Sequence, residues 1–400
     1  MRIQNEAHLS YCTNIHSGES WPEVFSSLQY TLAVKNLLQL DEKFGIGLRL
    51  SALASQQLAE SSNLEEFKYW LEANDCYVYT MNGFPYGGFH RTIVKDQVHS
   101  PDWTTIERLE YTRLLFSQLS SLLPEGIEGS ISTSPLSYKY WHKTDKALEE
   151  VKNKSMQLLI RLVSFLVNIE KEYGKLLHLD IEPEPDGVLE NSQEFITFYH
   201  EYLLLKGVPL LVKMNGMSRV KAESAIRNHI RLCYDVCHFA IAYESPEVVM
   251  KSMDENGIGI GKIQISAALK SHLNPVNINQ VKEGLLPYNE STYLHQTVFR
   301  KDNAELVKFP DLGDALKMIH EEEYRELRTH FHVPIFTETY GELKSTNDEI
   351  LKVFHQWKKR PQCKHFEVET YTWEVLPQRN KLKLAESISR ELEWVLKSIA

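Results

Sequence analysis

The sequence predicts a single α/β barrel in which eight short strands alternate with eight helices, and three observations support this prediction. Short runs rich in β-branched and aromatic residues alternate with longer segments of helical periodicity along all 400 residues. No glycine- or proline-rich linker, charge block or short repeat divides the chain. Apolar residues make up 42% of the chain and charged residues 24%, which is typical of a globular protein with a large core. One (β/α)₈ domain therefore covers residues 1–400.

Eight apolar, β-branched segments are predicted as the barrel strands. In chain order they are His8 to His16, Phe44 to Ser51, Tyr77 to Phe84, Ile127 to Ser134, Leu176 to Glu182, Leu232 to His238, Ile258 to Ser266 and His365 to Trp373. Segments with apolar residues three and four positions apart are predicted as helices, among them Thr104 to Leu123, Leu148 to Tyr173, Ser192 to Lys206, Ser345 to Lys358 and a terminal helix, Leu382 to Ile399.

The segment from Ala267 to Leu343 is far longer than an ordinary connection between two barrel strands. We expect this insertion, between strands seven and eight, to fold over the carboxyl-terminal mouth of the barrel with short helices of its own, as a lid or a substrate-selecting wall. The alternative is a structural insertion with no role in the chemistry. Its sequence His330 to Phe336, HFHVPIF, is predicted as a short strand that carries His332 over the mouth.

Three carboxylates fall at predicted strand ends, where barrel active sites lie. In HLDIE the apolar residues alternate with polar ones, so that Glu182 ends the fifth strand on the side of the barrel axis. Asp235 lies near the end of the sixth strand, in the pattern Asp-x-x-His with His238, and Glu369 lies near the end of the last. Because buried carboxylates are costly without a compensating cation, the pattern predicts a divalent metal site.

Two alternatives to this metal site were weighed. The carboxylates could instead form ion pairs with Arg49, Lys213 or other bases and only hold the barrel mouth together. Cys233 and Cys237 flank Asp235, but no second cysteine pair exists, so a thiolate zinc site is not expected.

Other polar and aromatic residues near strand ends are candidates for contact with a substrate. They are His16 after the first strand, Asn82 and His90 around the glycine-rich turn NGFPYGGFH, His238, His332 and Tyr371, the last as a ring that stacks on a sugar or a planar metabolite.

Composition excludes some classes of function. A net charge of −10 and a pI near 5.9 argue against a nucleic-acid partner. The five cysteines are odd in number and scattered, no secretory signal is seen at the start, and no window approaches the length of a membrane span. We therefore expect free thiols and a cytoplasmic protein. No Walker loop, GxGxxG, GxSxG or kinase signature is found.

Segments along nearly the whole chain, including HLSYCTNIHSGESWPEVF, NGFPYGGFH, LCYDVCHFAIAYE, HFHVPIF and VETYTWEVLP, resemble those of the metabolite traffic protein EboE family. That family in turn resembles the xylose-isomerase-like barrels, which include sugar-phosphate isomerases, tagatose and psicose epimerases and endonuclease IV. The resemblance implies a role in the processing or export of a small secondary metabolite, alongside a prenyltransferase-like membrane protein as a possible partner.

The resemblance also implies roles for individual residues. In the epimerases a divalent cation, here expected to be zinc or manganese, is held by Glu, Asp, His and Glu after strands five to eight, and the two glutamates exchange the substrate proton. These roles fall on Glu182, Asp235 and Glu369, with Gln264 where the family has its histidine. His332 is a possible replacement for that ligand.

Two hypotheses of function follow. The first is a metal-dependent isomerase or epimerase acting on a small polyhydroxylated or phenolic metabolite, with Glu182 and Glu369 as catalytic residues. The second is a metabolite carrier that keeps the barrel without proton transfer, which Gln264 favours. DNA repair of the endonuclease IV kind is disfavoured by the acidic composition.

Overall fold

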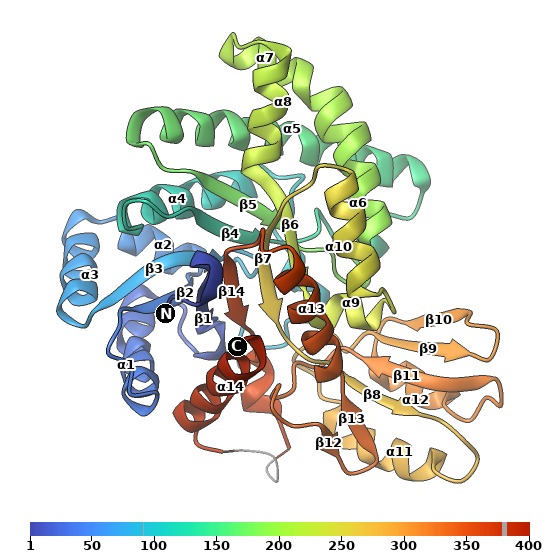
Figure 1. Cartoon of the computed structure of the whole chain (residues 1–400). Coiled ribbons are helices and arrows are strands. Elements are labelled where there is room, and N and C mark those ends of the chain that lie inside the picture. The colour runs from blue at the N-terminus through green and yellow to red at the C-terminus, as the bar shows by residue number, and fades with distance from the viewer. Residues whose placement is uncertain (91, 378–381) are drawn as a thin grey trace.

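The computed structural model describes residues 1–90, 92–377 and 382–400, and within them eight parallel strands form a barrel surrounded by helices (Figure 1). The neighbours run in the order β1-β14-β7-β6-β5-β4-β3-β2, and a parallel bridge between Cys12 and Gly47 brings the first and second strands together. The (β/α)₈ prediction is confirmed. The strands are β1 (His8–Tyr11), β2 (Phe44–Arg49), β3 (Cys76–Asn82), β4 (Gly129–Thr133), β5 (Leu177–Ile181), β6 (Ile230–Asp235), β7 (Ile260–Ile265) and β14 (His365–Val368).

Alternation along the strands places apolar residues against the helices and polar residues on the barrel axis. On β5, Leu177, Leu179 and Ile181 belong to the hydrophobic core. The alternate residues His178 and Asp180 are fully buried and have polar partners inside the barrel. This barrel interior is therefore strongly polar.

Helices cover the outside of the barrel, and side-chain caps fix where several of them begin. Ser51, Thr105 and Ser218 each accept a hydrogen bond from a backbone N–H of the first helical turn. The helices are α1 (Trp21–Leu37), α2 (Ala52–Leu58), α3 (Ser61–Ala73), α4 (Ile106–Leu122), α5 (Asp145–Tyr173), α6 (Ser192–Phe198), α7 (Val208–Asn215), α8 (Arg219–His229), α9 (Val236–Ile241), α10 (Pro246–Glu255), α13 (Asn347–Lys359) and α14 (Leu384–Ile399).

Short helical turns of other types lie between these elements. They are the 3₁₀ turns η1 (Gln4–Glu6), η2 (Thr13–Ile15), η3 (Lys95–His99), η4 (Lys139–Trp141), η6 (Leu286–Tyr288) and η7 (Tyr371–Val375), and the π-helical segment η5 (Tyr199–Gly207) that continues α6 into α7.

The run from α6 to α7, Ser192–Asn215, is long and apolar enough by length and composition to cross a membrane, which the sequence analysis did not anticipate. Half of its most apolar window is buried in the protein, where η5 and α7 contact α5 and α8. A core helix of a soluble protein meets the same criteria.

All eight barrel strands end before the predicted last residue, and three of them end at least three residues early. The first stops at Tyr11 and η2 follows; the sixth stops at Asp235, where α9 begins; the last stops at Val368 before η7. The residues that follow these three strands therefore occupy helical turns or loops at the barrel mouth.

The insertion between β7 and α13 is a second sheet, and the expectation of short helices describes only its smaller part. Its strands, all within the described residues, pair in the order β10-β9-β11-β8-β13-β12, with antiparallel neighbours throughout. Figure 1 shows this sheet beside the end of the barrel toward which β7 and β14 point. Its elements are β8 (Leu269–His272), α11 (Ile278–Leu285), β9 (Thr297–Lys301), β10 (Leu306–Phe309), α12 (Leu312–Met318), β11 (Tyr324–Thr329), β12 (Thr339–Tyr340) and β13 (Leu343–Ser345).

One buried acid ties the terminal helix to both the barrel and the insertion. Glu391 on α14 accepts hydrogen bonds from Thr370 Oγ1 at 2.7 Å and from the backbone N–H of Ile335 at 3.2 Å. Burial raises the pKa of Glu391 from 4.5 to about 7, although both hydrogen bonds lower it.

This gives a testable pH dependence. Between about pH 4.5 and 7 the folded protein keeps the Glu391 proton and the unfolded chain releases it, so the free energy of unfolding falls as pH rises. Glu391→Gln keeps the acceptor oxygen and removes the titration. Across this window the free energy of unfolding of the variant, relative to that of wild type, should therefore rise by up to about 3 kcal/mol. Denaturant unfolding at both pH values measures the gain. Glu386→Gln, exposed on the same helix, is the control, and an equal pH response of wild type and Glu391→Gln would contradict the assignment.

Candidate metal centre at the barrel mouth

Three buried carboxylates meet at the carboxyl end of the barrel. Glu182 follows β5, Asp235 ends β6 and Glu369 follows β14, and the three are 0 to 4% exposed. One carboxylate oxygen from each lies within 4.8 Å of one from each of the others. The structure thus brings together the three acids that the sequence predicted for this site.

The carboxylate of Asp235 is held in place by one of its oxygens while the other stays free. Oδ1 caps α9 by accepting from the backbone N–H of His238 at 3.0 Å, and it also accepts from Ser266 Oγ at 2.7 Å. Oδ2 is buried and has no hydrogen-bond partner among the described residues, and the same is true of Glu182 Oε2.

Three amide groups hold the carboxylate of Glu369. Asn14 and Asn82 donate to Oε1 at 2.7 and 2.8 Å, and Gln264 Nε2 donates to Oε2 at 2.5 Å. The carbonyl of Gln264 faces the thiol of Cys233 instead. The expectation that Gln264 offers its carbonyl to a metal is therefore not met, because its amide is oriented as a donor to Glu369.

His332 reaches the carboxylates from the insertion, in the segment that follows β11. Its Nδ1 is 2.9 Å from the backbone carbonyl of Glu369, so Nδ1 carries the proton and Nε2 carries the lone pair. Nε2 is buried and has no hydrogen-bond partner. A ring nitrogen of His332 lies within 4.8 Å of ligand atoms of both Asp235 and His238. The segment itself is a loop rather than the predicted strand.

A chain of hydrogen bonds fixes the ring of His238. Gln296 Nε2 donates to the carbonyl of Pro185, so Gln296 Oε1 accepts from His330 Nδ1 at 2.7 Å. His330 Nε2 then accepts from His238 Nε2 at 3.2 Å. His238 Nδ1 lies 3.4 Å from Glu182 Oε1.

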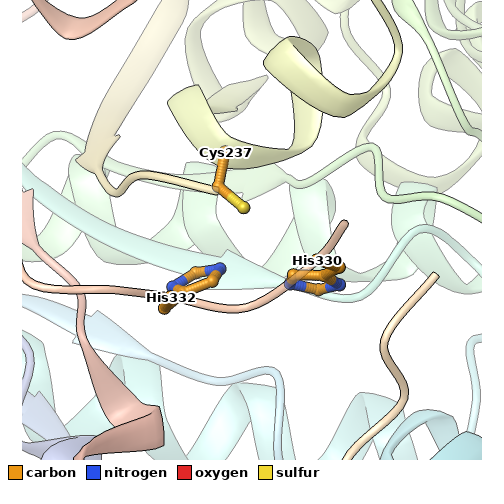
Figure 2. A group of neighbouring side chains, drawn as sticks. All are labelled: Cys237, His330 and His332. Carbon is orange, nitrogen blue, oxygen red and sulfur yellow. The ribbon is translucent and has the colours of Figure 1, made fainter. Parts of the chain in front are cut away.

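Cys237 on α9 faces the segment that carries His330 and His332 (Figure 2). Its sulfur and one nitrogen of each ring lie within 4.8 Å of one another, a grouping that the cysteine spacing did not predict. Burial raises the pKa of the Cys237 thiol well above its usual value, which disfavours the thiolate that a metal needs.

Burial and mutual repulsion dominate the protonation of this centre. Burial first, and then neighbouring carboxylates, raise the pKa of Glu182 and of Glu369 well above the usual value, and burial raises that of Asp235. Burial lowers the pKa of His332 to about 4 and that of His238 to about 3, so both rings are neutral at pH 7.

A divalent cation fits this set of groups. The free oxygens of Glu182 and Asp235 and the free nitrogen of His332 are buried atoms without partners. Carboxylate oxygens and a neutral imidazole suit zinc or manganese. The alternative ion pairs are not formed, because Arg49 pairs with Glu19 at 3.1 Å and Lys213 is exposed on α7.

A small cavity of about 50 Å³ opens onto these groups. Its floor includes Glu182 and Glu369, its sides include the loop after β3, and the insertion contributes Tyr293 and Leu294.

Most predicted substrate contacts line this cavity, namely Asn82, His238, His332 and Tyr371. His16 does not; its Nε2 is 2.9 Å from the hydroxyl of Tyr11 and its ring stacks on Tyr30, so the expectation for His16 is corrected. The first strand ends early, and η2 directs the buried ring of His16 to Tyr11 and Tyr30.

Asn14, Glu184 and His330 also border the cavity, although they were not predicted as site residues. Two features of the sequence could have identified Glu184 and His330. Glu184 repeats the acid of Glu182 in EPEP, and His330 lies two residues before His332. Nothing in the sequence marked Asn14, since its role depends on the short turn η2.

No protein-family profile matches the chain, and no curated protein matches its sequence. Among solved structures, a xylose isomerase-like TIM barrel protein from Mycobacterium smegmatis in complex with magnesium has a TM-score of 0.53 and 9% identity, over 100% of this chain and 98% of that one. An IolI protein with a bound zinc atom has a TM-score of 0.50 and 13% identity, over 98% of both chains. The fold is that of a xylose isomerase-like TIM barrel. At these identities the likeness extends to the fold of the barrel, and the candidate metal centre stands on its own geometry.

The centre makes a prediction about His332. His332→Gln removes the free nitrogen, so the dissociation constant for Mn²⁺, measured by electron paramagnetic resonance, should rise by more than the roughly 10- to 100-fold that loss of a supporting outer hydrogen bond costs. His320→Gln, exposed on the same insertion, should bind Mn²⁺ as wild type does. Equal affinity of both variants would exclude His332 as a ligand.

Proposed function

We propose that this chain is a cytoplasmic, metal-dependent isomerase or epimerase that acts on a small polyhydroxylated or phenolic metabolite. The observation that carries the proposal is the meeting of Glu182, Asp235 and Glu369 around unpartnered buried atoms, with His332 beside them. The xylose isomerase-like fold supports it, and two similar barrels were solved with magnesium and zinc.

The residues that would hold the cation are Glu182, Asp235, Glu369 and His332. Bound there, a divalent ion supplies polarisation of a substrate carbonyl and offsets negative charge that develops on its oxygen. No basic side chain pairs with the free oxygens of Glu182 and Asp235 among the described residues, which leaves them to the ion.

Glu182 is the better placed base for removal of a proton next to a carbonyl. With Oε2 left to the ion, its Oε1 lies 3.4 Å from His238 Nδ1. A proton taken by this carboxylate is therefore shared with the ring of His238, which the chain through His330 holds in one orientation.

Glu369 is the second acid–base candidate, to return the proton. Its carboxylate is kept in one orientation by Asn14, Asn82 and Gln264. Tyr371 borders the same cavity, with its ring 4.6 Å from that of His332, and offers an apolar face to a substrate.

The place of this reaction in the cell is also part of the proposal. The EboE-like segments favour processing of a secondary metabolite for export, with a membrane protein of the same pathway as partner. The five buried free cysteines fit a reducing cytoplasm.

A metabolite carrier on the same barrel is the second candidate. The observation that favours it is Gln264, which offers Glu369 a hydrogen-bond donor in place of an imidazole ligand. A carrier binds its metabolite at the mouth without exchanging any of its protons.

Proton exchange separates the two candidates. The protein, loaded with Zn²⁺ or Mn²⁺, is incubated in D₂O with a panel of ketoses, sugar phosphates and hydroxylated aromatic ketones, and hydrogen loss next to the carbonyl is followed by NMR. Glu182→Gln should slow exchange by about 10²- to 10⁴-fold while ligand binding is retained.

Glu322→Gln, an exposed acid on the insertion, is the matched control and should exchange as wild type does. A wild-type protein that binds a panel member tightly and exchanges none of its hydrogens would reject the enzyme and favour the carrier.

A further inference from the structure

A second group of metal-ligand side chains lies at the opposite, amino-terminal end of the barrel. His178 is the second residue of β5, His365 is the first of β14, and Glu128 directly precedes β4. One ligand atom from each lies within 4.8 Å of the others. His178 is four residues before Glu182, which at about 3.3 Å per residue separates the two centres by roughly 13 Å along the strand.

Both histidines have one nitrogen engaged and the other free. His178 Nδ1 is 2.7 Å from Asp180 Oδ1, and His365 Nδ1 is 2.7 Å from Ser130 Oγ. Within the part of the chain that the structure describes, the Nε2 atoms of both rings have no hydrogen-bond partner, although both residues are fully buried. When each Nδ1 donates to its oxygen partner, each Nε2 presents a lone pair. Carboxylate–histidine–metal arrangements have this geometry.

The surrounding chain is shaped to keep these partners in place. Gly261 on β7 lacks a side chain where a Cβ would overlap the Asp180 carboxylate, so the glycine makes room for the acid that orients His178. Ser130 Oγ, the partner of His365, is fixed in turn by Thr80 Oγ1 at 2.7 Å. The rings of His178 and His365 stack at 5.3 Å with an interplanar angle of 27°.

Access from solvent also fits a bound ion. Glu128 is held by Arg231 at 3.2 Å. A cavity of about 530 Å³ reaches the site from solvent, and Glu128 and His365 are among its lining residues.

We propose that His178 Nε2, His365 Nε2 and a carboxylate oxygen of Glu128 bind a zinc ion at the amino-terminal end of the barrel. Two imidazoles and one carboxylate form a donor set that suits zinc better than magnesium or calcium. The fourth position faces the cavity, where Arg2, Lys175 and Lys364 lie close enough to the opening to attract an anionic fourth ligand. This site is independent of the proposed function of the mouth.

The test counts zinc in four forms of the full-length protein after equilibration with Zn²⁺ and removal of the free ion. They are wild type, a mouth variant (Asp235→Asn with His332→Gln), a variant of the amino-terminal site (His365→Gln) and the combination of these two variants. Elemental analysis should give about two, one, one and no equivalents, one for each intact site. Circular dichroism and thermal unfolding report whether each variant is folded.

Two further variants make the test sharp. Glu128→Gln lies at the partly exposed rim, so it keeps the fold even if His365→Gln does not, and it should weaken zinc binding in the mouth variant at least about 10-fold. His8→Gln is the matched control, because His8 is a buried histidine at the same end whose Nδ1 is already 2.7 Å from the Tyr77 hydroxyl. It should leave zinc binding unchanged.

A mouth variant that is folded and holds no zinc would overturn the proposal, as would a Glu128→Gln variant with the affinity of its parent. If the mouth binds no metal and the proposed function is wrong, the result is different. The mouth variant would then hold the same number of zinc equivalents as wild type. In Co²⁺-substituted mouth variant, the absorption bands of a four-coordinate site should be present, and they should disappear with Glu128→Gln.

Discussion

The repulsion among three carboxylates buried at one end of the barrel is the constraint on which the rest of the mouth depends. Oxygens of Glu182, Asp235 and Glu369 approach within 4.8 Å of one another away from solvent. At an effective dielectric constant of about 20, two charges at that distance repel by roughly 3 kcal/mol. A cation held between them turns this repulsion into attraction, and a ring nitrogen of His332 lies within 4.8 Å of an oxygen of Asp235.

The polar column inside the barrel explains why this charge is tolerated. Below the mouth, Lys262 Nζ pairs with Glu367 at 2.9 Å and donates to the carbonyl of Met81, with Lys262 and Glu367 both fully buried. Further down, His178 and His365 each pair through one nitrogen only. The interior therefore passes from a carboxylate layer through an ion pair to a histidine layer, and its two ends suit ligands of different kinds.

The barrel and its three acids could be predicted because alternation along a strand is a local property. HLDIE reveals both the burial of Leu179 and the inward direction of Glu182, whatever the rest of the chain does. His332 was placed correctly at the mouth for a partly wrong reason, since the segment is a loop that follows β11 rather than a strand. The antiparallel sheet of the insertion was missed because its strands are two to six residues long and partly exposed.

The errors at single residues have a common physical origin in pairing across the fold. Gln264 was expected to offer a carbonyl, but Cys233 and Glu369 on neighbouring strands decide which way its amide points. His16 was expected at the mouth, but the turn η2 directs it to Tyr11 and Tyr30. The two histidines at the amino-terminal end were not recognised as a candidate site, because strand position alone does not reveal that His178 and His365 meet.

The central claim is that a cation occupies the space among the three mouth carboxylates and His332. The most direct measurement is anomalous diffraction at the zinc absorption edge from crystals soaked in Zn²⁺. If a cation binds there, an anomalous peak is expected about 2.0–2.2 Å from one oxygen each of Glu182, Asp235 and Glu369 and from His332 Nε2. A well-ordered mouth without a peak, with these carboxylates hydrogen-bonded to one another or to water, would contradict it.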